Sequence, residues 1–155
     1  MNTYPEYRSE MKDPQLISKY ILGGSGVLTL ESPTGKHHTY FFKKPREINT
    51  FPEDTVFVYA LHEKTKLFYV GMIERGRFRL THCSRFLNDT EIVRGARFIE
   101  KMSHKKFDTP MKLYHEGMCC RCGRKLTNPD SIKEGIGKRC KHKMETLMSS
   151  CPSAI

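Results

Sequence analysis

The chain has 155 residues, which allows one compact domain with a buried core plus a small metal-binding module. Its 27 Lys and Arg against 17 Asp and Glu give a net charge of +10, which favours polyanionic partners, chiefly nucleic acid. No apolar run approaches the roughly 20 residues of a membrane span and no signal-peptide core follows Met1, so we expect a cytoplasmic protein with reduced cysteines and no membrane partner.

The first two thirds of the chain predict one helix followed by several strands. Residues 1–12 are polar, and we expect a flexible N-terminus there. Asp13-Pro14 is typical of a helix N-cap followed by proline at the first helical position, and Gly23-Gly24 is an end signal. Alternating apolar residues bounded by turn signals then predict strands at 27–31, 38–44, 56–61, 67–73 and 78–81.

A longer helix and a last strand complete the predicted sheet domain. Asn88-Asp89-Thr90-Glu91 is a helix start signal, and inward apolar residues at helical spacing run to about Met102. A strand from Met111 into His115 follows. The chain therefore predicts an α+β fold, with a small, mostly antiparallel sheet and one packed helix over residues 13–110. A treble-clef-like zinc finger that ends in a helix is expected over 111–150, packed on the sheet.

The cysteines of the C-terminal third have the spacing of a metal site. Cys119 and Cys122 form a C-x-x-C pair followed by Gly123, as in a zinc knuckle, where glycine tolerates a left-handed backbone. Cys140 is the natural third ligand, since the seventeen residues between it and Cys122 suit a zinc-finger loop. A redox dithiol is disfavoured because glycine follows the pair and a third cysteine lies downstream. We predict one structural Zn²⁺.

The fourth ligand is open on spacing alone. His115 is favoured because it ends the strand that leads into the knuckle. His142, Cys151 and an open or water-filled position are the alternatives. Cys120 is expected to be a bystander, since a pair with Cys122 one residue apart is too tight to chelate well.

The segment from His115 to Cys140 also resembles a known module. The pattern His-Glu-Gly-x-Cys-x-x-Cys-Gly-Arg-x-Leu-Thr-x-Pro-x-Ser-Ile-x-x-Gly-Ile-Gly-x-x-Cys is similar to a zinc finger in small, uncharacterised proteins of bacteriophages and prophages. Residues 34–40 are similar to a sheet segment that often precedes it in those proteins. The resemblance implies His115, Cys119, Cys122 and Cys140 as the ligands. It implies a phage origin, hence the cytoplasm of a host cell, but no activity.

Basic residues are concentrated near the predicted metal. Residues 105–155 hold eleven basic and five acidic residues, so this third of the chain carries +6 of the +10. In the predicted strand after Gly76, alternating arginines fall on one face, although a solvated strand face has the same pattern. We predict a non-enzymatic protein that binds DNA or RNA through these side chains: Arg121, Arg124, Lys125, Lys138, Arg139, Lys141, Arg75, Arg77 and Arg79.

Two other functions are open to the same sequence. Small zinc fingers also bind proteins, so the alternative is an interaction module that captures a host protein, as a host-takeover or anti-defence factor does. A zinc enzyme is disfavoured. The nucleobase deaminases need His-x-Glu upstream of Pro-Cys-x-x-Cys, whereas Glu116 is adjacent to His115 and Met118 stands where the proline would be.

Overall fold

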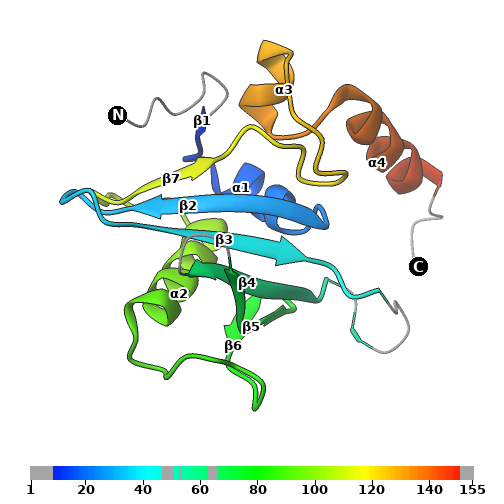
Figure 1. Cartoon of the computed structure of the whole chain (residues 1–155). Helices are drawn as coiled ribbons and strands as arrows, with labels where there is room; N and C mark the ends of the chain where they lie inside the picture. Colours follow the sequence, from blue (N-terminus) through cyan, green and yellow to red (C-terminus); the bar gives the residue numbers. More distant parts are fainter. Residues whose placement is uncertain (1–8, 47–50, 53, 63–65, 151–155) are drawn as a thin grey trace.

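The computed structural model describes residues 9–46, 51–52, 54–62 and 66–150 of the chain. Seven strands and four helices occur in these residues (Figure 1). In chain order they are β1 (Ser9–Glu10), α1 (Pro14–Ile21), β2 (Ser25–Glu31), β3 (His37–Lys43), β4 (Val56–His62), β5 (Lys66–Glu74), β6 (Arg77–Arg79), α2 (Glu91–His104), β7 (Lys112–His115), α3 (Pro129–Glu134) and α4 (Lys138–Ser150).

The strands form one antiparallel sheet in the order β1-β7-β2-β3-β4-β5-β6. With the helices and a C-terminal cysteine cluster next to α4, this confirms the predicted α+β class with a mostly antiparallel sheet. β7 is the last strand along the chain, yet it lies between β1 and β2. The strand that leads into the cysteine module is therefore an interior strand of the sheet.

Regular structure begins at Ser9, within the segment that the sequence predicts to be flexible. Residues 1–8 of the expected flexible segment lie outside the described residues. Ser9 and Glu10, however, pair with His115 and Tyr114 of β7, and Met11 is 3% exposed. Polar composition concealed this strand because an edge strand of two residues needs no apolar alternation.

Helices α1 and α2 pack on one face of the sheet (Figure 1). Asp13 caps α1 by accepting from the Gln15 N–H, and Thr90 caps α2 by accepting from the Val93 N–H. Alternation along β3 and β4 points the buried side chains of one core toward the helices: Tyr40, Phe42, Val56, Val58 and Ala60.

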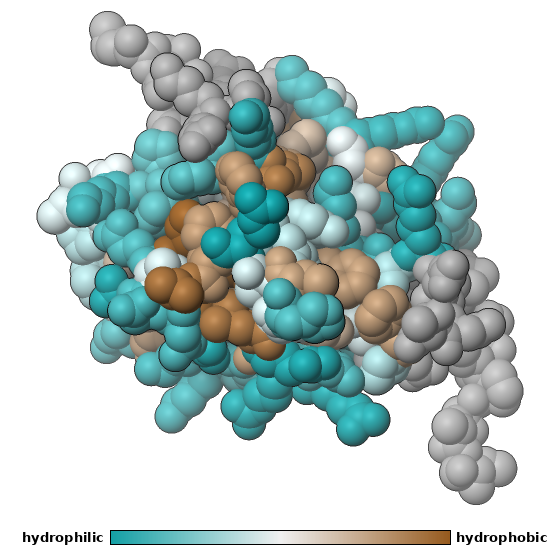
Figure 2. All heavy atoms as spheres, turned by 60° about the horizontal axis from the view of Figure 1, so that its bottom comes forward, coloured by the Kyte–Doolittle hydropathy of each residue, from teal (hydrophilic) through white to brown (hydrophobic). Residues whose placement is uncertain are grey.

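The other face of the sheet carries partly exposed side chains, Phe41, Phe57 and Tyr59 among them. Seen from the side of β5 and β6, the molecule shows apolar side chains gathered together and ringed by hydrophilic ones (Figure 2). None of the helices among the described residues combines the length and apolar character needed to cross a membrane.

Replacement of Gly95 by alanine should destabilise the fold although alanine favours helices. A Cβ at position 95 would overlap the Tyr40 hydroxyl, which donates to the Ile92 carbonyl at 2.6 Å in the buried core. Overpacking of this kind typically costs about 1–3 kcal/mol, more than the roughly 1 kcal/mol gained in helix propensity. Urea unfolding measures the loss. In a Tyr40→Phe background Gly95→Ala should cost less, and an equal cost would contradict the assigned clash.

Candidate metal centre

The knuckle between Cys119 and Arg124 is a tight backbone turn. The Cys119 N–H donates to the Arg124 carbonyl at 2.8 Å, and the Gly123 N–H donates to the Cys119 carbonyl at 2.9 Å. Gly123 has φ +77°, the left-handed conformation predicted for it, and Met118 forms a β-bridge with Lys125. The turn holds Cys119 and Cys122 on the same side of a short hairpin.

A short helix and a glycine stop bring the third cysteine back to the knuckle. Asn128 caps α3 by accepting from the Asp130 N–H at 2.9 Å, with Pro129 at the first helical position. Gly135 ends α3 with φ +76°, and Cys140 then lies in the first turn of α4. A hairpin knuckle followed by a cysteine-bearing helix is the order of a treble clef.

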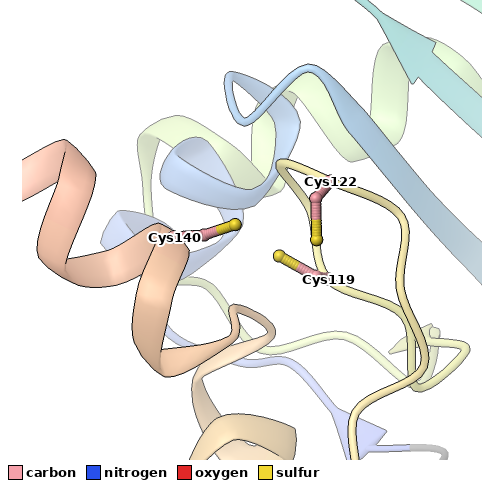
Figure 3. Close-up of side chains that lie close together, drawn as sticks. All are labelled: Cys119, Cys122 and Cys140. Carbon is pink, nitrogen blue, oxygen red and sulfur yellow. The ribbon is translucent and has the colours of Figure 1, made fainter.

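The sulfurs of Cys119, Cys122 and Cys140 converge (Figure 3). They lie within 4.8 Å of one another, and each cysteine is a free thiol. Three sulfurs on one tetrahedral zinc are about 3.8 Å apart, given a Zn–S distance of about 2.3 Å. The three cysteines thus form a group that can hold a metal ion, and a thiolate set of this geometry fits zinc.

Backbone donors surround the sulfur of Cys119. The N–H groups of Gly137 and Arg121 point at it, at 3.4 and 3.5 Å. Burial raises the pKa of this thiol, but backbone N–H groups, chiefly those of Cys122 and Gly137, outweigh burial and lower the pKa to about 7. The site therefore favours one thiolate before an ion arrives, and thiolate is the form that binds metal.

The other two buried thiols behave differently. Burial, followed by the neighbouring sulfurs, raises the pKa of Cys140, and the Arg121 side chain beside it acts in the opposite direction. Cys140 must therefore lose a proton when an ion binds. Cys120 is 3% exposed and lies outside the metal group. Burial raises its pKa to about 12, so it serves as a packing residue.

His115 does not join the three sulfurs. Its Nδ1 accepts from the Gly117 N–H at 3.0 Å and its Nε2 contacts the Ile132 carbonyl, so both ring nitrogens are engaged within the protein. The ring is buried and stacks on Tyr20, with centroids 5.6 Å apart. Because a carbonyl only accepts, the neutral ring carries its proton on Nε2. This arrangement gives His115 a structural role and does not support it as the fourth ligand.

Of the other residues considered for the fourth ligand, the structure describes only His142. His142 is exposed and is not in the metal group. Cys151 lies outside the described residues. Within the part of the chain that the structure describes, Cys119, Cys122 and Cys140 are the grouped ligands, so the ligand set there stands at three.

The predicted basic residues divide between two places. Arg121 is half-buried beside the metal group, and Lys141 pairs with Glu134 at 2.9 Å. The other predicted residues of the module are exposed: Arg124, Lys125, Lys138 and Arg139.

The arginines after β5 lie at the far edge of the sheet, with β2, β3, β4 and β5 between β6 and β7. Arg77 and Arg79 share a face of β6, but Arg75 is in the preceding turn with φ +53°. They are therefore separated from the basic residues of the module, and only Arg77 and Arg79 form the predicted row.

The sequence did not predict the contacts that the knuckle makes with the sheet domain. The Tyr20 hydroxyl donates to the Met118 carbonyl at 3.0 Å, and the Ser25 N–H donates to the Cys120 carbonyl at 2.7 Å. A Cβ at Gly23 would lie 2.6 Å from the Cys120 carbonyl oxygen and its sulfur. Gly23-Gly24 was recognised as a helix end, and the same pair permits this close approach.

Substitution of Cys122 by serine should abolish tight metal binding. Cys122 is exposed, so its thiol contributes little to packing and its loss reports on the metal. We expect zinc affinity to fall by more than about 100-fold, beyond the roughly 10–100-fold typical of outer-shell partners. Elemental analysis and a melting temperature with and without chelator provide the measurement. Cys83→Ser is the control, because Cys83 is also exposed but lies outside the metal group. This variant should still bind one zinc, and chelator should still lower its melting temperature.

His115→Gln distinguishes a structural from a ligating histidine. We expect zinc content to be retained and the free energy of unfolding to fall by about 1–3 kcal/mol, because buried backbone groups lose their partners. Loss of zinc comparable to that of Cys122→Ser would show that His115 is a ligand.

The pH dependence of the same pair of proteins tests the buried neutral ring. Burial lowers the pKa of His115 below the value of about 6.5 in an unfolded chain. Protonation then favours unfolding, so the ring's stabilisation is complete above about pH 6.5 and declines as pH falls below it. The stability difference between wild type and His115→Gln should therefore shrink from pH 7 to pH 5. The cysteines are common to both proteins, so their titration cancels in the comparison.

The family comparison falls on this module. Residues 113–145 match a family of unknown function, DUF6011. The match covers most of β7, the knuckle, α3 and the first half of α4, and it includes the three grouped cysteines. No curated protein and no solved structure matches the chain. The segment singled out in the sequence is thus a recognised module, while its phage origin stays a prediction.

Proposed function

We propose that the chain is a non-enzymatic zinc protein that binds nucleic acid through the basic surface of its cysteine module. The observation that carries the proposal is the concentration of exposed cations on the segment whose three grouped cysteines can hold a metal ion. Among the described residues of the module these cations are exposed: Arg124, Lys125, Lys133, Lys138, Arg139, Lys141 and Lys143. Their acidic counterparts are fewer, and Glu134 already pairs with Lys141.

The zinc would act as a structural element. An ion held by Cys119, Cys122 and Cys140 would fix the knuckle against the start of α4. Three thiolates and one Zn²⁺ leave a net negative charge, which Arg121 beside Cys140 offsets. Exposed cations further out, such as Arg124, Lys138 and Arg139, would contact a polyanion.

The basic surface continues onto the sheet at the corner where β2 begins and β3 ends. The Lys44 N–H donates to the Gly24 carbonyl, and a Cβ at Gly24 would meet the Lys44 side chain at 3.7 Å and the Arg121 carbonyl at 4.0 Å. Lys43 pairs with Ser25 in the same corner. Lys43 and Lys44, and not the arginines of β6, are therefore the basic residues of the sheet domain that lie beside the knuckle.

Nucleic-acid binding by the zinc-loaded protein should be strongly salt-dependent. Each phosphate contact contributes about 0.9 to the slope of log affinity against log salt on duplex DNA. The double variant Arg124→Gln, Arg139→Gln should bind a fluorescent duplex more weakly and reduce the slope by about 1–2. Fluorescence anisotropy at several salt concentrations, with DNA and RNA probes, measures both.

A variant of equal charge change controls for the general field of the protein. Lys105→Gln, Lys106→Gln removes two exposed cations from the connection between α2 and β7. It should lower affinity much less than the module variant. Equal effects of the two variants would remove the module as the binding surface. Absence of binding to any DNA or RNA at low salt would contradict nucleic-acid binding altogether.

A further inference from the structure

The sheet face opposite the helices carries a continuous group of large side chains. Phe41 pairs with Tyr59 across β3 and β4, Tyr59 pairs with Tyr69 across β4 and β5, and Phe57 pairs with Met72. Cross-strand partners share a face, so these five side chains lie together. We call them the aromatic face. Its four rings are only partly buried, although rings of this size are usually covered in a core.

The aromatic face contains a hollow of about 550 Å³. Phe57, Tyr59 and Tyr69 line it, with Phe51 and Met72. The rings meet edge to face, at 66° for Tyr59 and Tyr69 and at 73° for Phe57 and Tyr69. These tyrosine and phenylalanine rings therefore do not stack on one another, and a flat group that enters the hollow can stack on a ring.

Basic side chains lie at both borders of the aromatic face. On the β3 side, the Lys43 Nζ lies 5.9 Å from the centroid of the Tyr59 ring. On the β6 side, Arg79 pairs with Met72 and lines the hollow, with its guanidinium held by Glu74 at 3.0 Å. Arg77 is exposed on the same face of β6. Through Lys43 and Lys44 the aromatic face also joins the corner that contacts the knuckle.

We propose that the aromatic face stacks the unpaired bases of single-stranded nucleic acid, a deepening that rests on the proposed nucleic-acid function. Lys43 on one border and Arg77 and Arg79 on the other would contact its phosphates. An apolar hollow alone would suit a peptide as well. Cations on both borders, in a chain of net charge +10, favour a polyanion that also presents flat apolar rings, and single strands combine the two. Duplex bases are already stacked and cannot reach the hollow.

The test compares a fluorescein-labelled dT₁₂ strand with a labelled 12-base-pair duplex on the zinc-loaded full chain. Tyr59→Leu, Tyr69→Leu removes two rings, and we expect at least about tenfold weaker binding of dT₁₂ with duplex affinity unchanged. Tyr59→Phe, Tyr69→Phe keeps the rings and should bind like wild type. Phe68→Leu is the matched control, because Phe68 pairs with Ala60 on the opposite face of the same strand. The chain has seven tyrosines and no tryptophan, so quenching of tyrosine emission by dT₁₂ gives a second readout.

The outcomes separate this inference from the proposed function. If the leucine variant folds by circular dichroism and binds dT₁₂ as wild type does, the aromatic face is not the site, while duplex binding through the module stands. Self-association that the leucine variant abolishes would show that a second copy covers the face and would equally overturn the inference. Failure of wild type to bind either probe would remove the proposed function itself.

Discussion

The close contact between the knuckle and the corner of α1 and β2 fixes the arrangement of this protein. The Cys120 backbone and sulfur leave no room for a side chain at Gly23, and the Tyr20 hydroxyl reaches across to the Met118 carbonyl. On the other side of Tyr20 the buried His115 ring stacks and binds the carbonyl of Ile132. Each of these groups is buried or half-buried, so moving the module would leave polar atoms without partners. The metal group is thereby oriented by the sheet domain.

This orientation fixes where the basic residues of the module lie relative to the sheet. A flexible zinc finger would present its lysines and arginines in many positions, whereas here the knuckle adjoins Lys43 and Lys44 at the end of β3. The lysine pair is the place where the basic module and the partly exposed rings of β4 and β5 meet. The cationic surface of the module and the aromatic face of the sheet are thus neighbours, because the knuckle packs against the turn at Gly23-Gly24.

The sequence predicted what local chemistry determines. The Cys-x-x-Cys-Gly turn, the return of Cys140 and the α+β sheet follow from cap signals, glycine positions and strand alternation. The contacts of His115 did not follow, because spacing to the cysteines cannot reveal that both ring nitrogens contact Gly117 and Ile132. The position of the β6 arginines did not follow either, since strand order depends on long-range pairing.

The interior position of β7 has a consequence for biosynthesis. During translation β2 to β6 leave the ribosome before residues 112–115, so β2 has one unpaired edge until β7 has been synthesised. An open edge of a strand rich in apolar residues is a surface for intermolecular pairing. Closure joins residues that are more than eighty positions apart, such as Leu28 and His115, and contacts of such separation form slowly. Completion of the sheet is therefore a late event that accompanies formation of the cysteine module, and nascent chains that stall before β7 would be the aggregation-prone species.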